Sequence, residues 1–379
     1  MTRNIKIILF TIYIFSCKNR TSDHKYYLDD WRIINSIKQG KVNEKFSLSL
    51  KKIDAFTYSF SGRWFIVKDR IILFDDLYRL ITVFNFDGVL FNQYGGLNVS
   101  ELQDVWTRPY SILPYDTGYV SIFDRSVAFL DREFRVKKIN SLNFEGNKNS
   151  LSMLELPDPE NMNAYELNER NRNFFHINNK EILVSLESEA PLFNPYNTES
   201  YYRMARSFGL VNLNNKSLSP VPIGKSKVYN DTCCLTFQDG NYITGNDKMY
   251  FVQFAADTLI YVYNQNFEKE YAFGVKGKFI LNQVINNGLE VAFDYDKYLN
   301  IEQNANVFEN IFNLKNGYVG RILNNRTEKK KWIQLFIENQ LDRQFEIPSK
   351  FSFIGVYENA IYFVCQNELK KSIDLCIIR

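Results

Sequence analysis

From Phe46 to the C-terminus, short apolar runs alternate with polar residues, chiefly Asn, Asp and Gly. Runs of this length that end at turn residues predict β-strands. The runs fall into groups with a shared order, in which a strand ending in Asp is followed by a strand, a polar turn and a final strand. The first two groups contain residues 64–67, 70–75, 80–84 and 89–91, and residues 110–113, 118–124, 127–130 and 134–136. The pattern therefore predicts a repeated four-stranded unit.

The same unit recurs along the rest of the chain. Its later copies are recognised from the strand pairs 174–177 and 181–184, 248–252 and 258–263, 317–323 and 331–337, and 353–357 and 360–364. The last copy lacks a fourth strand, and the early segment 45–50 would complete it by pairing the two ends of the chain. Repeated units of this kind predict an all-β, six-bladed β-propeller over residues 46–379. The rival fold, a pair of β-sandwiches, does not explain such even recurrence.

Three polar connections are longer than a bare propeller needs: 141–172, 188–206 and 276–307. Long loops on a rigid scaffold often carry function. Ordinary insertions produce the same pattern, so the connections by themselves only mark where binding residues are to be sought.

The N-terminus follows a different pattern. A basic start with Arg3 and Lys6 precedes the apolar run 7–15, and Ser16 and Cys17 come next. This order resembles a bacterial lipoprotein signal peptide, in which a small residue precedes the cysteine that becomes the lipidated N-terminus. The run is too short for a membrane-spanning helix, which needs roughly 20 apolar residues, so lipid on Cys17 would provide the anchor. The alternatives are an ordinary cleaved signal with a coincidental cysteine and a short buried element.

The predicted organisation is a signal peptide at 1–16, a tether at 17–45 and the propeller at 46–379. Within the tether, apolar spacing near 3.6 over residues 26–40 predicts one short helix. The polar segment directly after Cys17 lacks the acidic cluster that surface-exported lipoproteins tend to carry. We therefore expect a lipid-anchored protein of the cell envelope, at the outer membrane and facing the periplasm.

Composition restricts the chemistry. The 379 residues have a formal net charge of +3, which leaves no basic excess for a nucleic-acid partner. Only two histidines occur, His24 and His176, so a zinc site built on several histidines is excluded, and a Ser-His-Asp triad would have to use one of them. His176 lies in an apolar run and is expected to be a strand residue. We expect neither a metal nor a cofactor.

Four cysteines follow Cys17. Cys233 and Cys234 are adjacent, so a bond between them would form a strained ring. Cys365 and Cys376 flank a predicted hairpin, where they face each other either as a disulfide or as buried free thiols.

One stretch after the first predicted unit carries a family resemblance. It contains residues 86–88 (Phe-Asp-Gly), 94–96 (Tyr-Gly-Gly), 100–102 (Ser-Glu-Leu) and 108–109 (Arg-Pro). With the signal and the repeat, it resembles the Bacteroidetes six-bladed β-propeller lipoproteins of the NHL/TolB-like kind, in which an Asp-Gly turn and a Gly-rich loop lead into the next blade. The resemblance implies the propeller fold and an envelope location, but no reaction.

No motif assigns a catalytic residue. The sequence has no Gly-x-Ser-x-Gly elbow, no sialidase Asp-box and no calcium loop of the EF-hand type. Asp294 and Asp296 alternate on one face of a predicted strand, where they would bind a cation, act as a carboxylate pair or simply face solvent.

Aromatic residues beside arginines are the binding candidates, because such side chains stack on a sugar ring or a peptide. In the connection 188–206 the candidates are Tyr196, Tyr201, Tyr202 and Arg203. The alternative is that these rings pack the loop against the propeller. A second candidate is the pair Trp106 and Arg108 after the Gly-rich loop.

The leading hypothesis is a non-catalytic, lipid-anchored propeller that acts as a binding or assembly module. Its partners would be the membrane, through the N-terminal lipid, and a glycan, a peptide or another envelope protein. The alternative is a carbohydrate-active enzyme, a glycoside hydrolase or lyase that uses carboxylates on propeller loops. A central pocket with two carboxylates roughly 5–10 Å apart favours the enzyme, and an aromatic-lined face favours binding.

Overall fold

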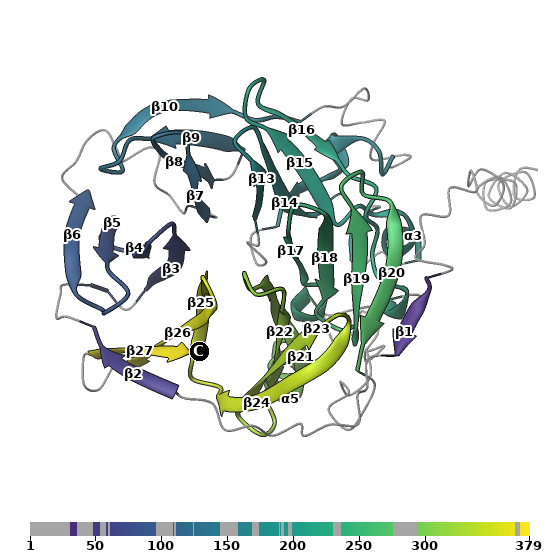
Figure 1. Ribbon diagram of the computed structural model, residues 1–379. Helices are drawn as coiled ribbons and strands as arrows, with labels where there is room; N and C mark the ends of the chain where they lie inside the picture. The colour runs from purple at the N-terminus through teal and green to yellow at the C-terminus, as the bar shows by residue number, and fades with distance from the viewer. Residues whose placement is uncertain are drawn as a thin grey trace, which may run out of the picture.

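In the computed structural model, six β-sheets form a ring around a central axis, and each sheet contains a four-stranded antiparallel blade (Figure 1). The predicted all-β, six-bladed propeller is therefore confirmed. The structure describes residues 31–35, 48–53, 58–59, 61–95, 109, 111–123, 125–144, 158–168, 174–188, 190, 193–195, 199–229, 236–275, 294–367 and 372–379.

Each blade extends from an inner strand beside the central axis to an outer strand at the rim of the ring. Blade 1 contains β3 (Gly62–Val67), β4 (Arg70–Asp75), β5 (Leu80–Phe84) and β6 (Leu90–Gly95). Blade 2 contains β7 (Ser111–Tyr115), β8 (Gly118–Phe123), β9 (Ser126–Leu130) and β10 (Val136–Ser141). Blade 3 contains β13 (Phe175–Asn178), β14 (Glu181–Glu187), β15 (Phe208–Asn212) and β16 (Ser217–Pro220). The short strands β11 (Asn143–Phe144) and β12 (Glu166–Leu167) extend its sheet.

The other three blades follow in chain order. Blade 4 contains β17 (Asn241–Gly245), β18 (Met249–Phe254), β19 (Leu259–Asn264) and β20 (Lys269–Gly274). Blade 5 contains β21 (Asn306–Asn313), β22 (Val319–Asn325), β23 (Lys330–Ile337) and β24 (Gln340–Pro348). Blade 6 contains β25 (Ser352–Tyr357), β26 (Ala360–Asn367), β27 (Ser372–Ile378) and, from the other end of the chain, β2 (Leu48–Lys52).

The two ends of the chain close the ring. Strand β2 pairs antiparallel with β27, with Leu48 opposite Ile378 and Lys52 opposite Asp374. The predicted completion of the last unit by the early strand is therefore confirmed. Because blade 6 contains strands from both ends of the chain, their pairing holds the ring closed.

Blade stacking explains why whole strands are apolar. Four consecutive residues of β4, from Ile71 to Phe74, are at most 1% exposed. Ile71 and Leu73 pack into the cluster shared with blade 6, whereas Ile72 and Phe74 pack into the cluster shared with blade 2. Successive strand residues point to opposite faces, and both faces of each blade are covered by a neighbour. The sequence of β4 therefore lacks the polar–apolar alternation that is typical of a sheet with one solvent-exposed face.

The Asp that ends the second predicted strand has a local role. Asp75 is 1% exposed, and its carboxylate accepts hydrogen bonds from the backbone N–H of Ser59, Leu77 and Tyr78 at 2.6, 3.0 and 2.7 Å. These bonds satisfy turn donors that the strand ladder leaves unpaired.

Two inner strands were missed from the sequence. The fourth and fifth units open with β17 and β21, which precede the strands predicted at 248–252 and 317–323. Both strands begin with Asn and contain further polar residues, which weakens the apolar signal. Inner strands line the central channel, and so they keep polar residues on their exposed side.

Two N-terminal and loop predictions need correction. Within 26–40, where a short helix is predicted, Ile33–Asn35 form β1, which pairs parallel with β20. Asp294 and Asp296 do not lie on a strand. Asp294 is the N-cap of helix α5 (Tyr295–Asn304), and its Oδ1 accepts a hydrogen bond from the backbone N–H of Lys297 at 3.1 Å. A carboxylate at this position satisfies a free helix N–H.

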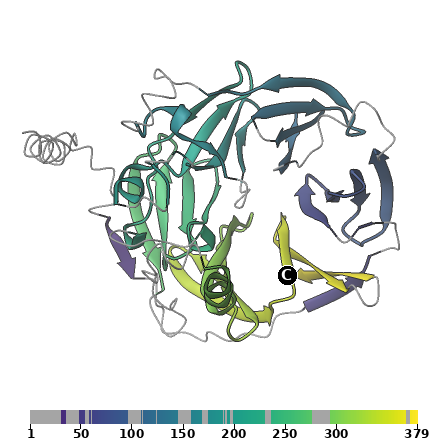
Figure 2. The ribbon, with the colours of Figure 1, turned by 180° about the vertical axis from the view of Figure 1, so that it is seen from behind.

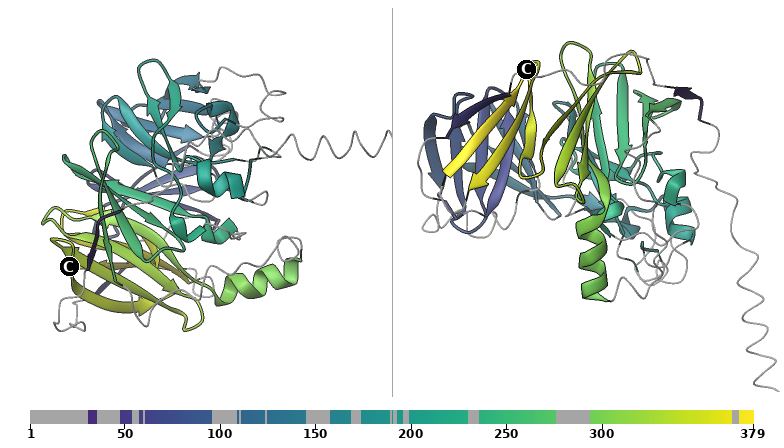
Figure 3. Two further views of the ribbon diagram at one scale, coloured as in Figure 1. Left: turned by 90° about the vertical axis from the view of Figure 1, so that its right-hand side faces the viewer. Right: turned by 90° about the horizontal axis from the view of Figure 1, so that it is seen from below.

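The short helices lie on the face where one blade connects to the next. Helix α5 precedes β21 and projects from this face, and α3 (Glu199–Met204) lies on the same side (Figures 2 and 3). The other helical turns in the described part of the chain are η2 (Met162–Ala164), η3 (Lys227–Tyr229) and η4 (Thr236–Gln238). Among the described residues, no helix has the length and apolar character that crossing a membrane requires.

Candidate functional site

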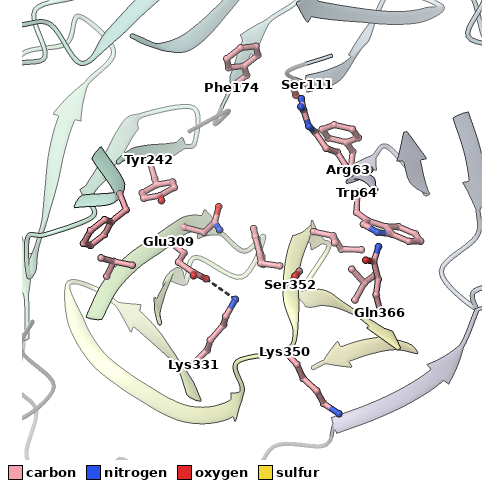
Figure 4. Close-up of a pocket in the computed structure, with 18 of the residues that line it drawn as sticks. Arg63, Trp64, Ser111, Phe174, Tyr242, Glu309, Lys331, Lys350, Ser352 and Gln366 are labelled. Atoms are coloured by element: carbon pink, nitrogen blue, oxygen red, sulfur yellow. Dashed lines mark ion pairs between the residues drawn. The ribbon is translucent and has the colours of Figure 1, made fainter. Parts of the chain in front are cut away.

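A cavity of about 830 Å³ opens at one end of the central axis (Figure 4). Its wall is formed largely by the first residues of the inner strands β3, β17, β21 and β25. Inner strands begin where one blade connects to the next, so we call this cavity the connection-face pocket. Its place on the axis brings together residues from most of the blades.

The charge of the connection-face pocket is unbalanced. Among its described lining residues, Glu309 is the single carboxylate, and four side chains are cationic: Arg63, Arg326, Lys331 and Lys350. A concave site dominated by one sign of charge attracts ligands of the opposite sign.

An ion pair lies near the middle of this pocket. Lys331 Nζ is 2.8 Å from Glu309 Oε2, and the two side chains are 9% and 23% exposed (Figure 4). Asn324 donates a further hydrogen bond to the Glu309 carboxylate. The β21–β22 register shifts between Phe308 and Asn310, so Glu309 is the extra residue of a β-bulge. A bulge re-aims one side chain, and here that side chain meets Lys331.

Tyr242 of β17 reaches the same place from the neighbouring blade. Figure 4 shows its hydroxyl pointing into the pocket on the side of Glu309. Burial, and secondarily the negative charge of Glu309, raises the pKa of the Tyr242 phenol, while Arg326 acts in the opposite direction. The phenol therefore stays protonated and retains an O–H that can donate to an anion.

The opposite wall of the pocket comes from blades 1, 2 and 6. Arg63 Nη1 donates to the carbonyl oxygen of Pro109 at 2.5 Å, and its guanidinium lies beside Ser111 (Figure 4). Trp64 lies next to Gln366 in the same view. The indole Nε1 of Trp64 is buried and has no hydrogen-bond partner among the described residues. A planar guanidinium and an indole N–H are both suited to oxygen-rich ligands.

Helix α5 stands at the rim of this pocket. Arg326 Nη1 donates to the carbonyl oxygen of Glu302 at 2.6 Å and lies 3.6 Å from its carboxylate. The guanidinium also lies 5.4 Å from the centre of the Phe237 ring, which meets Tyr298 edge-on at 5.9 Å. Arg326 thereby links the pocket wall to the helix.

The chemistry of the described wall favours binding over hydrolysis. Glycosidase chemistry needs two carboxylates, whereas the described lining offers Glu309, already paired with Lys331. The cations, the neutral phenol and the rings of Trp64 and Phe237 are typical of a site for an anionic ligand with a ring or an apolar part.

The structure places two predicted binding residues in the interior. Tyr201 and Tyr202 lie in α3 and are 0% and 2% exposed. Tyr201 meets Phe193 edge-on at 5.3 Å, and Tyr202 stacks on Tyr229 at 5.4 Å. This burial fits the alternative in which the aromatics pack the 188–206 connection against the propeller. Arg203 beside them is exposed, and its binding role stays a prediction.

Several sequence predictions concern residues outside those that the structure describes. They include the lipid attachment site, the second aromatic–arginine pair, one tyrosine of the 188–206 connection and the adjacent cysteines: Cys17, Trp106, Arg108, Tyr196, Cys233 and Cys234. The roles given to these residues stay predictions.

The hairpin cysteines are buried free thiols. Cys365 pairs across the strands with Asp374, and Cys376 pairs with Phe363, so the two cysteines are diagonal neighbours on one face of the sheet. Of the two alternatives left open, the structure shows the free thiols. Burial raises the pKa of the Cys376 thiol to about 11.

The remaining titratable candidates do not form a site. His176 lies half-buried in β13, and burial lowers the pKa of its imidazole. Among the described residues, no group of three or more His, Cys, Asp and Glu side chains is placed to hold a metal ion.

The residues of the connection-face pocket were not found from the sequence. Glu309 and Tyr242 lie on the two inner strands that were missed, and Lys331 opens an otherwise ordinary predicted strand. Their separation along the chain gives no local motif. The only available signal was the presence of polar residues in short strands next to long connections.

Comparison with known proteins supports the fold alone. No protein-family model matches the chain, and no curated protein matches it. A solved structure of a DUF4221 family member from Bacteroides vulgatus is similar, with a TM-score of 0.61 and 11% identity over 89% of this chain and 97% of that one. A Bacteroides fragilis protein has a TM-score of 0.47 and 11% identity over 92% of this chain and 99% of that one. A streptogramin B lyase has a TM-score of 0.43 and 8% identity over 88% and 98%. The propeller implied by the family resemblance is thus supported, whereas the lipoprotein family stays a prediction.

Proposed function

We propose that this protein is a non-catalytic binding module of the cell envelope, anchored by lipid on Cys17, whose propeller takes an anionic ligand into the connection-face pocket. The observation that carries the proposal is the lining of that pocket, which has four cationic side chains, of which Lys331 is paired with Glu309 and Arg326 with Glu302.

Each side of the pocket contributes a different kind of contact. Arg63 offers a planar, permanently charged fork that matches carboxylate, sulfate or phosphate oxygens. Lys331 offers a point charge that can turn from the Glu309 carboxylate to an anionic group of the ligand. Tyr242 offers a neutral O–H. Charged groups in a partly enclosed site bind ligands more strongly than the same groups on an open surface.

The direct test uses the soluble form that starts at Ser22 on an array of glycans and peptides. Each acidic member should be paired with a neutral analogue that lacks only the carboxylate, sulfate or phosphate. We expect retention of acidic members, with binding that weakens as salt rises because the charges are screened. Equal retention of neutral and acidic members would contradict the proposal.

A substitution then locates the binding site. Lys331→Met removes a pocket cation and leaves the Glu309 carboxylate facing the ligand, so affinity for an acidic probe should fall about tenfold or more. The matched control is Lys138→Met, the same change on the exposed face of outer strand β10. Thermal melts of both variants check folding. An unchanged affinity in a folded Lys331→Met variant would place binding elsewhere.

The anchor is tested separately from the ligand. Cys17→Ala should abolish incorporation of labelled fatty acid and move the protein out of the membrane fraction. Continued lipid labelling or continued membrane association would contradict the anchoring proposal, without bearing on the pocket.

A further inference from the structure

The far end of the central axis carries a second cavity, of about 580 Å³. Its wall comes from the last residues of β17, β21 and β25 and from the hairpin turns that follow β17 and β21. We call it the hairpin-face pocket. The same inner strands therefore line one pocket with their first residues and the other with their last.

The two pockets abut inside the ring. Phe174 and Phe353 line both of them. Strand β21 passes from Glu309 in the connection-face pocket to Asn313 in the hairpin-face pocket, a distance of about 13 Å at roughly 3.3 Å per strand residue. A single elongated ligand can therefore contact both.

The second pocket has a different chemical character. Eight of its fifteen described lining residues are apolar, among them Ile243, Ile311, Phe312, Leu314 and Val356. Its uncharged polar residues are Thr244, Asn246 and Asn313. Phe312 stacks on Phe353 at 5.4 Å, which forms an aromatic wall where the pockets meet. Lys315 is the one charged residue in the described lining, and it is solvent-exposed.

We propose that the ligand is a single-chain anionic amphiphile. Its headgroup lies in the connection-face pocket against Lys331, and its apolar chain extends past Phe174 and Phe353 into the hairpin-face pocket. This inference rests on the proposed function and adds to it the class of ligand. The shared chemistry is a carboxylate, sulfate or phosphate joined to a hydrocarbon chain.

The expected signature is a dependence of affinity on chain length. Each methylene transferred from water to an apolar site should tighten binding about fourfold. The gain should continue until the chain fills the hairpin-face pocket and should then level off. Binding should also carry a negative heat-capacity change that grows with chain length.

The experiment is calorimetric titration of the soluble form with hexanoate, octanoate, decanoate and dodecanoate below their micellar concentrations. Decanol tests the need for a charged head, and glucuronate tests an anion without a chain. Decyl sulfate and decyl phosphate distinguish the headgroups. We expect affinity to rise along the carboxylate series and decanol to bind at least tenfold more weakly than decanoate.

Two variants test the head site and the chain site separately. Lys331→Met should weaken every chain length by the same factor, because it changes only the head site. Val356→Asn should weaken decanoate and dodecanoate but not hexanoate, because it places an amide in the chain site. Its control is Val136→Asn, a half-buried valine on outer strand β10.

The outcomes separate this inference from the proposed function. Binding of glucuronate and all carboxylates with no dependence on chain length would overturn the amphiphile and leave anion binding intact. Equal binding of decanol and decanoate would overturn both. If Val356→Asn fails to fold, the heat-capacity change of binding to the unchanged protein, measured along the carboxylate series, still tests the chain site. The same heat-capacity change for every chain length would refute the chain site.

Discussion

The blades are joined by two kinds of seam. The seam between blades 4 and 5 contains a buried cation. Arg321 of β22 is 1% exposed and donates to Gln334 Oε1 at 2.7 Å, to Gln253 Oε1 at 3.0 Å and to the carbonyl oxygen of Thr258 at 2.6 Å. Its guanidinium lies 4.3 Å from the centre of the Phe308 ring. We call this the polar seam.

The seams on either side of blade 6 are apolar. Ile373, Leu375 and Ile377 of β27 face the cluster shared with blade 1, while Cys376 and Ile378 face the cluster shared with blade 5. We call these the dry seams. Gly355 fits here because its φ of +144° suits glycine, and an added Cβ would lie 3.1 Å from Ile66 of blade 1.

The two kinds of seam differ in how strongly their interactions depend on the direction of the contacting groups. Dispersion and hydrophobic burial depend on volume and area, so the dry seams tolerate small changes of shape. Hydrogen bonds to a buried guanidinium require each acceptor in one place. Gln334 of the polar seam lies in β23 with Lys331, and Gln253 of β18 is paired with Tyr242 of β17. Phe308 precedes Glu309 in β21. The polar seam therefore fixes the blades that bring these three side chains together.

The largest expected effect is that of Arg321→Leu. The substitution leaves three buried acceptors without their donor, and the free energy of unfolding should fall by about 3–5 kcal/mol. Arg135→Leu, at a side chain that is 71% exposed, is the matched control and should change stability by less than about 0.5 kcal/mol. Urea unfolding measures both.

A combined variant tests whether unpaired acceptors cause that loss. Replacing Gln253 and Gln334 by Leu together with Arg321→Leu removes two of the stranded side-chain acceptors, so part of the lost stability should return. If the combined variant is less stable than Arg321→Leu alone, the bonds that the two glutamines donate to Gln344 Oε1 and to the carbonyl oxygens of Phe254 and Asp257 outweigh those that they accept from Arg321.

A smaller effect is expected for Gln334→Leu alone. Gln334 accepts from Arg321 and donates to Gln344 Oε1 at 2.7 Å. The variant leaves one guanidinium N–H and one amide oxygen without a hydrogen-bond partner, so the free energy of unfolding should fall by about 1–3 kcal/mol. Affinity for an acidic probe should fall as well if this seam positions Lys331, and an unchanged affinity would separate the seam from the site.

The dry seams should respond less to a change of similar size. Ile71 is fully buried against blade 6, and Ile71→Val removes one methylene, so it should cost about 0.5–1.5 kcal/mol. Thermal and urea unfolding give the value. A loss as large as that of Gln334→Leu would mean that shape in the dry seams is as strictly specified as hydrogen bonding in the polar seam.

The last effect concerns a thiol of the dry seams and is expected only at high pH. Burial raises the pKa of Cys376 from 9.0 to about 11, and the charge of Cys365 adds to the shift. The folded state therefore holds this proton more tightly than the unfolded state does. The resulting stability is present below pH 9 and is lost as pH rises through about 11.

The measurement is the difference in unfolding free energy between the unchanged protein and Cys376→Ala across that pH range. Between pH 9 and 11 the unfolding free energy of the unchanged protein should fall relative to that of Cys376→Ala. Native Cys376 should resist alkylation until the protein unfolds. A constant difference, or rapid alkylation of the folded protein, would show that this seam admits water.

Much of the fold was predictable because its signals are local. Strands such as β4 and β19 are continuous apolar runs bounded by turn residues, and the early segment around Leu48 had no partner other than the incomplete last unit. The missed strands β17 and β21 are those whose residues face a polar channel, where the apolar signal is weakest. The predicted helix at 26–40 includes β1, whose strand form depends on its pairing with distant β20.

The candidate site was harder to predict than the fold. The sequence drew attention to Tyr201 and Tyr202 because aromatics in a polar connection suggest exposure, but α3 packs both rings inward. In contrast, Glu309 belongs to a bulge and Lys331 is the second residue of β23, so neither residue is conspicuous in the sequence.

By itself, the sequence determined the number of blades and the closure of the ring. Strand periodicity and turn chemistry act over a few residues, and six repeats of one unit leave few ways to bury their faces. Only the tertiary structure decided where charge collects. Tyr242, Glu309 and Lys331 come from three strands of two blades. They meet because blades 4 and 5 pack across the polar seam, an event that no local pattern encodes.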